Sequence, residues 1–449
     1  MELSYRMRIK HYRTIFRDTL KIYRAALKYI INVCDKEWDI INDLTGKEQI
    51  NQVEHLNHKT NDNPIVKYDF DKKFYKFPGY FRRAAIQDAL GSVSSYKSNL
   101  INWEINGRKG RRPFLKTNQN KFPCFYKGNM YNKLDDYKVQ IKIYHNNDWV
   151  WLDIEFKKSD VDYIKRNYFD WNQSNPTLEL NGKIWALRFL YKKDISLSKT
   201  KLKGQIVVGV DLNTINHNAV CSAINYNGTV IGRKFINFPI ENDHLNNCIK
   251  RKNKAIKLNQ PKQNYKDELF LYNYNKTPRL WRFIDYANKE IAVLTARAIV
   301  DFAKSVNADV IVFEHLDTNK RKRFLKEKLH LWCAKTIQKI TTSLAHKNGI
   351  HIRTVFANGT SKYAFDGSGE VKRGKKGSPS FPYDLCIFTT GKIYNSDLSA
   401  SYNIAARYFI KEIEKSKPKK YMAAKAKDPS LAKRSTCTLD TLIRLAKVA

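Results

Sequence analysis

The chain has 449 residues, enough for two to four domains with at least one large core. It carries 82 Lys and Arg residues against 43 Asp and Glu residues, a formal net charge of +39 at pH 7. A charge this one-sided repels itself unless an anionic partner shares it, and nucleic acid is the commonest such partner, because contacts with phosphates release counterions. A basic ribosomal or chromatin protein without catalytic chemistry and a protein bound to an anionic membrane surface are the alternatives.

The sequence gives no sign of a membrane span, a secretion signal or a cysteine framework. No stretch approaches the roughly 18 apolar residues that a membrane-spanning helix needs, and the N-terminus MELSYRMRIKHYR is charged where a signal peptide would be apolar. We therefore expect a cytoplasmic protein with no membrane partner. Its seven cysteines are odd in number and form no CxxC pair, so neither a disulfide framework nor a four-cysteine zinc site is expected. The oligomeric state is not indicated.

The first 200 residues combine helical and strand patterns. Apolar residues recur at spacings of three and four over 14–38 and over 81–103, which predicts two helices of a small helical lobe. Apolar and polar residues alternate in VQIKIY and VWLDIEF, and Asn181-Gly182 favours a hairpin turn before KIWALRFLY. With MRIK as a candidate first strand, these patterns predict a small antiparallel sheet or barrel.

From about residue 204 the predicted order is strand, strand, strand, helix, strand, helix, strand, loop, helix. QIVVGVDL and ADVIVFEHL are apolar on both faces, which is typical of central strands. Helices are predicted over 286–306 and 325–347, before the strand HIRTVF and a Gly-, Ser- and Lys-rich loop over roughly 357–382. SASYNIAARYFI predicts a closing helix, and the Lys- and Ala-rich tail after about residue 411 is expected to be partly disordered. The alternation indicates an α/β fold.

Three carboxylates stand at the ends of these elements. Asp211 ends the first strand, Glu314 ends the strand VIVFE, and Asp397 precedes a helix in YNSDLSASYNIA. Buried strands seldom end in carboxylates for packing reasons, because a lone buried charge is costly; for Asp397, helix capping is the competing explanation. Converging carboxylates offer hard oxygen ligands for Mg²⁺ or Mn²⁺, and two such ions can clamp the attacking water and the leaving oxygen of a phosphodiester. We predict that Asp211, Glu314 and Asp397 are metal ligands and catalytic residues.

Residues 204–410 resemble the RuvC nuclease half of TnpB (OrfB), an insertion-sequence-encoded RNA-guided nuclease related to miniature type V CRISPR effectors. GVDLN (209–213), VFEHLD (312–317) and NSDLSASYNI (395–404) are similar to its three motifs. The third family motif is close to D-x-N-A-x-x-N-I; this chain has Ser399 in place of the usual Asn but keeps Ala400 and Asn403. AAIQDALGSVSSYKSNLINWE resembles the helical recognition lobe of the family, and FPCFYKGNMYN resembles the beginning of its wedge barrel.

The resemblance implies an α/β RNase H-like (RuvC) nuclease domain with an N-terminal helical lobe and a small antiparallel β-barrel (wedge) domain. The implied domains are a wedge-type β domain (1–15 and 125–200), a helical recognition lobe (16–124), a RuvC-type nuclease domain (204–356 and 393–412), an inserted target-nucleic-acid-binding segment (357–392) and a basic C-terminal tail (413–449).

The function implied by the resemblance is RNA-guided DNA cleavage. Such a protein binds a guide RNA and a double-stranded DNA target, recognises a short flanking DNA motif, and hydrolyses phosphodiester bonds with two metal ions at the bacterial nucleoid. Two alternatives stay open, a guide-RNA-bound DNA-binding repressor without cleavage and an RNase H-like transposase.

One departure from the family concerns zinc. Most of its members carry a CxxC…CxxC zinc ribbon between the second and third motifs, whereas here Cys386 is the sole cysteine of that interval. We therefore expect no zinc, and an inserted segment stabilised by Tyr363, Phe365, Phe381 and Tyr383.

Three clusters of basic residues are candidates for contacting nucleic acid, although charge runs are more often solvated faces. The clusters are Arg108, Lys109, Arg111 and Arg112; Lys320, Arg321, Lys322 and Arg323; and Lys372 and Arg373, followed by Lys375 and Lys376. The second cluster follows the Glu314 strand by a few residues, which favours contact with a nucleic-acid backbone at the site.

Overall fold

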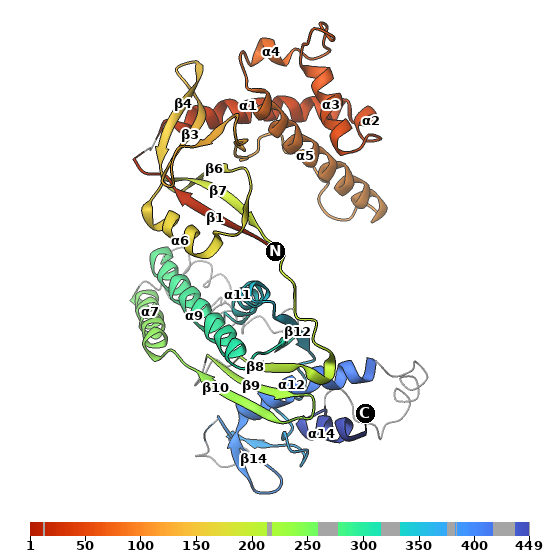
Figure 1. Ribbon diagram of the computed structural model, residues 1–449, viewed down its shortest axis with the longest axis vertical. Helices are drawn as coiled ribbons and strands as arrows, with labels where there is room; N and C mark the ends of the chain where they lie inside the picture. The colour runs from red at the N-terminus through yellow and green to blue at the C-terminus, as the bar shows by residue number, and fades with distance from the viewer. Residues whose placement is uncertain are drawn as a thin grey trace. The chain divides into compact units, whose positions relative to one another are not determined.

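The computed structural model describes residues 1–11, 14–212, 218–258, 277–315, 333–374, 382, 384–415 and 436–448 (Figure 1). The chain divides into two compact units, Met1–Asp194 and Ile195–Ala449. Within the residues described, none of the helices combines the length and the apolar character that crossing a membrane requires.

The first unit contains two antiparallel sheets. One is ordered β1-β7-β5, with β6 also paired to β7, and the other is ordered β2-β3-β4. The strands predicted from VQIKIY, VWLDIEF and KIWALRFLY are β3, β4 and β7, and Gly182 takes φ +60° in the turn from β6 to β7. The strand bounds are β1 Glu2–Arg8, β2 Tyr131–Lys133, β3 Lys138–His145, β4 Asp148–Glu155, β5 Asn172–Gln173, β6 Thr177–Asn181 and β7 Ile184–Lys192; α6 (Lys158–Tyr168) follows β4.

The helices of this unit pack around one aromatic core. The two predicted helices are α1 (Phe16–Lys36) and α5 (Gly79–Ile105), which contact each other along their buried faces. Three shorter helices lie between them: α2 (Trp38–Ile41), α3 (Gly46–Asn57) and α4 (Phe70–Lys73). The rings of Phe70, Phe74 and Phe77 contact one another with centroids 4.7–6.0 Å apart, and Phe77 meets the other two edge to face.

The second unit is built on a five-stranded sheet ordered β10-β9-β8-β11-β12. The first three strands in chain order are antiparallel neighbours, and β11 and β12 add to β8 in parallel. The bounds are β8 Ile206–Asp211, β9 Ala219–Asn225, β10 Val230–Ile236, β11 Val310–Glu314 and β12 His351–Val355, with the 3-10 turn η1 Leu202–Gly204 before β8. The predicted mixed α/β architecture is thus present.

Helices cover both faces of this sheet. Val208 faces α9 (Pro278–Ser305) and α11 (Ala334–Lys347), whereas its neighbour Val207 faces α12 (Ser396–Lys415) and α14 (Leu439–Val448). A further helix, α7 (Pro239–Leu258), packs on α9. Because β8 and β11 are covered on both faces, their sequences are continuous apolar runs. The helix α9 begins earlier than predicted, at a Pro in its first turn, because its buried stripe extends back to Trp281.

The C-terminal region is helical at both ends of its tail. α12 continues to Lys415, and α14 packs on α12 and buries Leu439 and Leu442 in the core. Tail residues 416–435 lie outside the described part of the chain. Two strands of the inserted segment, β13 (Lys372–Arg373) and β14 (Leu385–Ile387), form a small antiparallel sheet with β15 (Ile393–Asn395), which follows it.

Candidate active site

The fold brings the predicted carboxylates to one end of the sheet. Asp211 is the last residue of β8 and Glu314 is the last residue of β11, and these two strands are parallel neighbours in which Val210 pairs with Phe313. Parallel strands end at the same edge of a sheet, so both side chains lie at that edge. Asp397 lies in the first turn of α12, which packs across β8 and β11.

Burial and like charge dominate the electrostatics of this edge. Burial, together with the negative charges of Glu314 and Asp397, raises the pKa of Asp211 well above its usual value, while Arg373 and the backbone N–H of Leu212 oppose this more weakly. Burial also raises the pKa of Glu314. Asp211 is therefore near enough to Glu314 and Asp397 for their negative charges to act on it.

Asp397 is not a helix cap. The residue that caps α12 is Asn395, whose Oδ1 accepts hydrogen bonds from the backbone N–H groups of Asp397 (3.1 Å) and Leu398 (2.9 Å). Asp397 itself is buried, and its Oδ1 lies 3.3 Å from the hydroxyl of Ser396 and 3.5 Å from Nη2 of Arg373. The competing explanation drawn from the sequence, that this Asp serves as a cap, does not hold.

Gly209 allows α12 to lie close to β8. A Cβ at this position would come 2.3 Å from the backbone O of Ser401, 2.7 Å from the N of Ala405 and 2.8 Å from its Cβ. Real Cβ atoms do not make such contacts, so any side chain here would push the helix away. The glycine of the GVDLN motif therefore fixes the distance at which the helix carries Asp397 over the strand that ends in Asp211.

The first residues of the inserted segment support Glu314. The hydroxyl of Thr360 donates to Oε1 of Glu314 and lowers the pKa of that carboxyl, although burial outweighs this effect. Asn403 on α12 holds the loop, since its Nδ2 donates to the carbonyls of Thr360 and Tyr363, both at 2.9 Å. Its Oδ1 accepts from the backbone N–H of Leu439 at 3.1 Å, which ties the C-terminal segment to the same side chain.

Arg407 is a buried cation beneath the site. Its Nη1 donates to the carbonyls of Phe356 (2.6 Å) and Asn358 (2.9 Å), and its Nε donates to the carbonyl of Cys437 (3.1 Å). Its charge lowers the pKa of Glu314. Sequence reasoning missed both Arg407 and Thr360; a signal for Arg407 was available, because a charge inside the apolar run YNIAARYFI requires buried partners.

The donor set fits a hard divalent cation, although it is not a closed cage. Across the described ranges, no group of three or more His, Cys, Asp or Glu side chains is arranged as a ready metal site. Carboxylate oxygens are the ligands that Mg²⁺ and Mn²⁺ prefer, and a cation would offset the negative charges of Glu314 and Asp397 that, after burial, raise the pKa of Asp211. Asp211, Glu314 and Asp397 are the residues that would hold such an ion.

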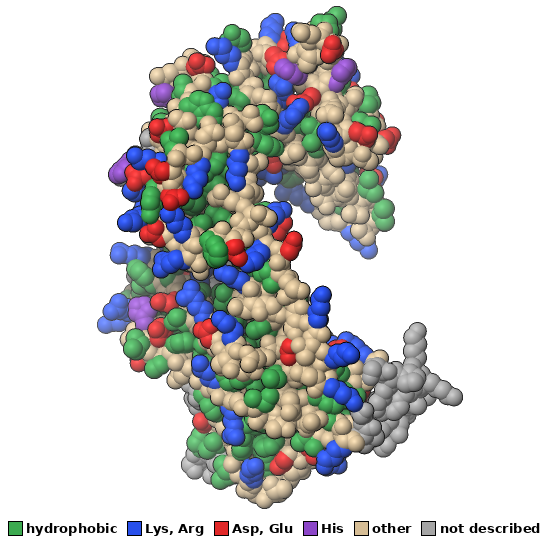
Figure 2. Space-filling view, in the orientation of Figure 1, with side chains coloured by type: hydrophobic (Ala, Val, Ile, Leu, Met, Phe, Trp, Pro, Cys, Tyr) green, Lys and Arg blue, Asp and Glu red, His purple; other side chains and the backbone are tan. Residues whose placement is uncertain are grey.

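The three basic clusters have different surroundings. Arg108, Lys109, Arg111 and Arg112 are exposed beyond the end of α5, where Arg108 lies 5.8 Å from the ring centre of Trp103 and Arg111 lies 5.6 Å from that of Phe114. Figure 2 shows Lys and Arg side chains spread over the visible face, interleaved with Asp and Glu.

The remaining two clusters lie in the second unit. Lys320, Arg321, Lys322 and Arg323 fall outside the described residues, as do Lys375 and Lys376. Lys372 is exposed on β13, but its neighbour Arg373 turns toward α12, where Nη2 donates to the Ser396 hydroxyl at 2.8 Å. The structure therefore places Arg373 beside a carboxylate of the site, a contact that the charge run did not indicate.

An aromatic cluster joins the inserted segment to β15 and α12. The ring of Phe365 lies 5.6 Å from that of Phe388, 5.0 Å from that of Tyr394 and 5.1 Å from that of Tyr402. Cys386 is buried against this cluster. Tyr363 is half-buried outside it, and Phe381 and Tyr383 lie outside the described residues.

Comparison with known proteins agrees with the motifs. The Aq_aa04 family model matches residues 3–145. The TnpB-like protein aq_aa05 of Aquifex aeolicus (strain VF5) is 24% identical over 241 residues, covering 49% of this chain and 73% of that protein. The chain is thus a relative of a TnpB-like protein, which confirms the resemblance drawn from its motifs.

Solved structures with similarity to the chain include two type V effectors. A Cas12f1–sgRNA–target DNA complex gives a TM-score of 0.49 at 15% identity, covering 87% of this chain and 81% of that one. Alicyclobacillus acidoterrestris C2c1 in complex with single-guide RNA gives a TM-score of 0.43 at 10% identity, covering 86% and 65%.

Proposed function

We propose that this protein is an RNA-guided DNA endonuclease of the RuvC type, in which Asp211, Glu314 and Asp397 form the catalytic centre. The observation that carries the proposal is that β8 and β11 end in Asp211 and Glu314 at one edge of the sheet, while α12, which packs across both strands, carries Asp397. Burial, and then the charges of Glu314 and Asp397, raise the pKa of Asp211. Evolution seldom retains such repulsion for packing, because uncompensated buried charge is destabilising. The intact trio also disfavours a repressor that has lost cleavage.

The topology supports an RNase H-like nuclease domain. The strand order β10-β9-β8-β11-β12, in which three antiparallel strands are followed by two parallel ones, is that of the RNase H-like fold. Two of the carboxylates lie on its strands β8 and β11, and the third lies on the helix that crosses them. The antiparallel sheets of the first unit are assigned to the wedge domain, and α1 to α5 to the recognition lobe.

Each side chain of the proposed site has a defined task. Divalent ions, when bound, supply the activation of water and the stabilisation of the leaving oxygen in phosphodiester hydrolysis. Thr360 orients Glu314 through its hydroxyl, and Asn403 holds Thr360 in place. Gly209 sets the approach of the helix that carries Asp397. Arg373, next to Asp397, is positioned to offset negative charge at the site.

The charge of the chain supports nucleic-acid partners. A net charge of +39 suits a protein that holds a guide RNA and a double-stranded DNA target at once. A short flanking DNA motif and an association with the bacterial nucleoid belong to the same proposal. Candidate contacts are the exposed cluster Arg108, Lys109, Arg111 and Arg112, together with Lys372.

The experiment that tests this function is recovery of the guide. RNA that copurifies with the protein is sequenced, and DNA carrying the complementary sequence next to randomised flanks is offered with Mg²⁺. The proposal expects a discrete RNA and cleavage of matching DNA only beside certain flanks. Cleavage that ignores the RNA sequence, or the absence of bound RNA, would exclude RNA guidance.

A further inference from the structure

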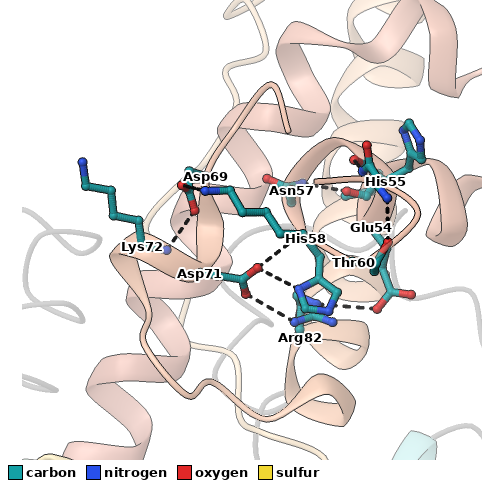
Figure 3. Close-up of polar contacts among 12 residues, drawn as sticks. Glu54, His55, Asn57, His58, Thr60, Asp69, Asp71, Lys72 and Arg82 are labelled. Carbon is teal, nitrogen blue, oxygen red and sulfur yellow. Dashed lines mark hydrogen bonds and ion pairs between the residues drawn. The ribbon is translucent and has the colours of Figure 1, made fainter. Parts of the chain in front are cut away.

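Buried polar side chains form networks in both units. In the first unit, Arg82 lies between Glu54 and Asp71 (Figure 3). Nδ1 of His58 lies 2.8 Å from the same Asp71, so this cluster is held together by its own members. The network of the second unit instead reaches the proposed catalytic site. It begins in the C-terminal segment, which is defined as residues 436–448 and contains none of the three proposed metal ligands.

Asn403 on α12 is the junction of the second network. The side chain is fully buried, and its Nδ2 donates to the carbonyls of Thr360 and Tyr363, both at 2.9 Å. Its Oδ1 accepts from the backbone N–H of Leu439, the first residue of α14, at 3.1 Å. Carbonyls only accept and N–H groups only donate, so a single orientation of the amide satisfies all three contacts. The Leu439 N–H therefore favours the orientation in which Asn403 holds Thr360.

Thr360 connects this network to a proposed metal ligand. Its carbonyl is held by Asn403, and its hydroxyl donates to Oε1 of Glu314. A change in the orientation of the Asn403 amide would release the Thr360 carbonyl. The hydroxyl that orients Glu314 would then lose its fixed position.

Arg407 is a second link between the C-terminal segment and the same stretch of chain. Its Nε donates to the carbonyl of Cys437 in the C-terminal segment at 3.1 Å. Its Nη1 donates to the carbonyls of Phe356 (2.6 Å) and Asn358 (2.9 Å), just before Thr360. Because a guanidinium is planar and rigid, these bonds fix the C-terminal segment against the residues that lead to Thr360.

The C-terminal segment packs on three parts of the second unit. Leu442 is fully buried in the core that α12 forms with the sheet. The backbone N–H of Asp440 donates to the carbonyl of Phe365 in the inserted segment at 3.0 Å. In the turn between β9 and β10, a Cβ on Gly228 would lie 2.5 Å from Cγ1 of Ile443, so the absence of a side chain lets α14 approach this closely. These contacts hold the backbone of the segment in one place relative to the polar network.

We propose that the C-terminal segment is a positioning element of the catalytic site, and that its Leu439 N–H sets the geometry of Glu314. The effect passes through the Asn403 amide and the Thr360 hydroxyl. Because Leu439 and Cys437 both act through main-chain groups, the site depends on where the segment docks rather than on a particular side chain of it. The inference rests on the proposed function, since it takes Glu314 to be a metal ligand.

Leu439→Pro in the full chain tests the proposal by removing the backbone N–H. Proline is tolerated at the first residue of a helix, where the N–H has no acceptor within the helix. The matched comparison is Leu439→Ala, which also loses the leucine side chain but keeps the N–H. The difference between the two variants therefore isolates the hydrogen bond to Asn403.

Metal binding and cleavage are measured separately in these variants. Electron paramagnetic resonance gives the Mn²⁺ affinity without nucleic acid, and single-turnover cleavage of guide-matched DNA gives the Mg²⁺ requirement. We expect Leu439→Pro to bind Mn²⁺ about tenfold more weakly than Leu439→Ala and to need about tenfold more Mg²⁺. Guided DNA binding in Ca²⁺ should be equal in both. Equal Mn²⁺ affinities in the two variants would overturn the proposal.

A double-mutant cycle distinguishes positioning from a merely structural role. If the Leu439 N–H acts through the Thr360 hydroxyl, Leu439→Pro should weaken Mn²⁺ binding little further in a Thr360→Val background. The double variant should then bind Mn²⁺ about tenfold more weakly than the wild type, as each single variant does. Losses that multiply to about a hundredfold would show independent effects and overturn the proposal.

The control for loosened packing is Leu445→Ala. Leu445 packs against the same core from the last turns of α14, away from the bond to Asn403. This variant should lower Tm and keep the Mn²⁺ affinity of the wild type. A loss of affinity as large as that of Leu439→Pro would reduce the effect to general destabilisation and overturn the proposal.

Thr441→Val decides the matter if Leu439→Pro does not fold. Oγ1 of Thr441 accepts from the backbone N–H of Thr438 at 3.1 Å, in the turn that presents Leu439. Loss of this contact should weaken Mn²⁺ binding about threefold, and an unchanged affinity would overturn the proposal. A wild-type chain that neither binds Mn²⁺ nor cuts matched DNA would refute the proposed function itself. A wild type that does both, with no change in these variants, refutes this inference alone.

Discussion

Replacing Gly209 by Ala should separate DNA cleavage from DNA binding. The added Cβ would lie 2.3 Å from the backbone O of Ser401 and 2.7 Å from the N of Ala405. Because both neighbours are helix backbone, neither can rotate away, and restoring van der Waals contact requires α12 to move by about 1 Å. Overpacking of this kind costs about 1–3 kcal/mol of stability.

The same displacement moves Asp397 relative to Asp211 and Glu314. A misplacement of about 1 Å in a catalytic constellation can reduce the rate about 100-fold. The assay measures single-turnover cleavage of guide-matched DNA, with binding followed separately in Ca²⁺. We expect a large loss of rate with binding nearly unchanged.

The matched control is Gly232→Ala in β10 of the same sheet. There a Cβ would meet Val306 and Phe302 side-chain atoms at 3.4–3.5 Å, which is ordinary contact. This variant should cleave like the wild type. Wild-type cleavage by Gly209→Ala, or an equal loss in Gly232→Ala, would refute the reasoning that close helix approach sets the site.

Three further predictions follow from the contacts of the site. Thr360→Val removes the hydroxyl that donates to Glu314, so half-maximal cleavage should need about tenfold more Mg²⁺. The control is Thr389→Val, which removes a 2.6 Å hydrogen bond to the Ser368 carbonyl elsewhere in the inserted segment. This control should need the same Mg²⁺ concentration as the wild type. In the metal-free protein, the raised pKa of Asp211 contributes stability at low pH that is lost as the pH rises through that pKa. The Tm of Asp211→Asn should therefore exceed that of the wild type most at high pH, and the difference should shrink on acidification. A Tm difference that stays constant with pH would contradict the assignment. The inserted segment should fold without zinc, because Phe365 and its neighbouring rings fill its core; chelation of zinc should leave Tm unchanged, and one tightly held zinc per chain by elemental analysis would contradict this.

The elements that carry the site could be predicted from sequence because their patterns are local. β8 and β11 are apolar on both faces and end in carboxylates, so their type and their last residues are readable without tertiary information. Asn403 was identified through the third motif, but its role was not, since it bonds to the carbonyls of Thr360 and Tyr363 across the fold. Thr360 was missed because an exposed-looking loop carries no pattern that marks one hydroxyl.

Other features escaped prediction because composition masked them. The Lys- and Ala-rich tail ends in a short amphipathic helix whose Leu439 and Leu442 pack in the core beside α12. The sequence signal for this helix was only the three-residue spacing between these two leucines. Arg373 was grouped with a charge run, yet it faces Ser396 and Asp397, a contact that depends on the pairing of β13 with β14. Long-range pairing of this kind is not encoded in local periodicity.

Cleavage by single-carboxylate variants tests the central claim most directly. Asp211→Ala, Glu314→Ala and Asp397→Ala are compared with Asp301→Ala, an exposed carboxylate on α9, for cleavage of guide-matched DNA in Mg²⁺ and for guided DNA binding. The account predicts that the first three variants bind the target but do not cut it, while Asp301→Ala does both. Retained cleavage in any of the three would remove that residue from the site, and loss of binding in all three would assign them a structural role instead.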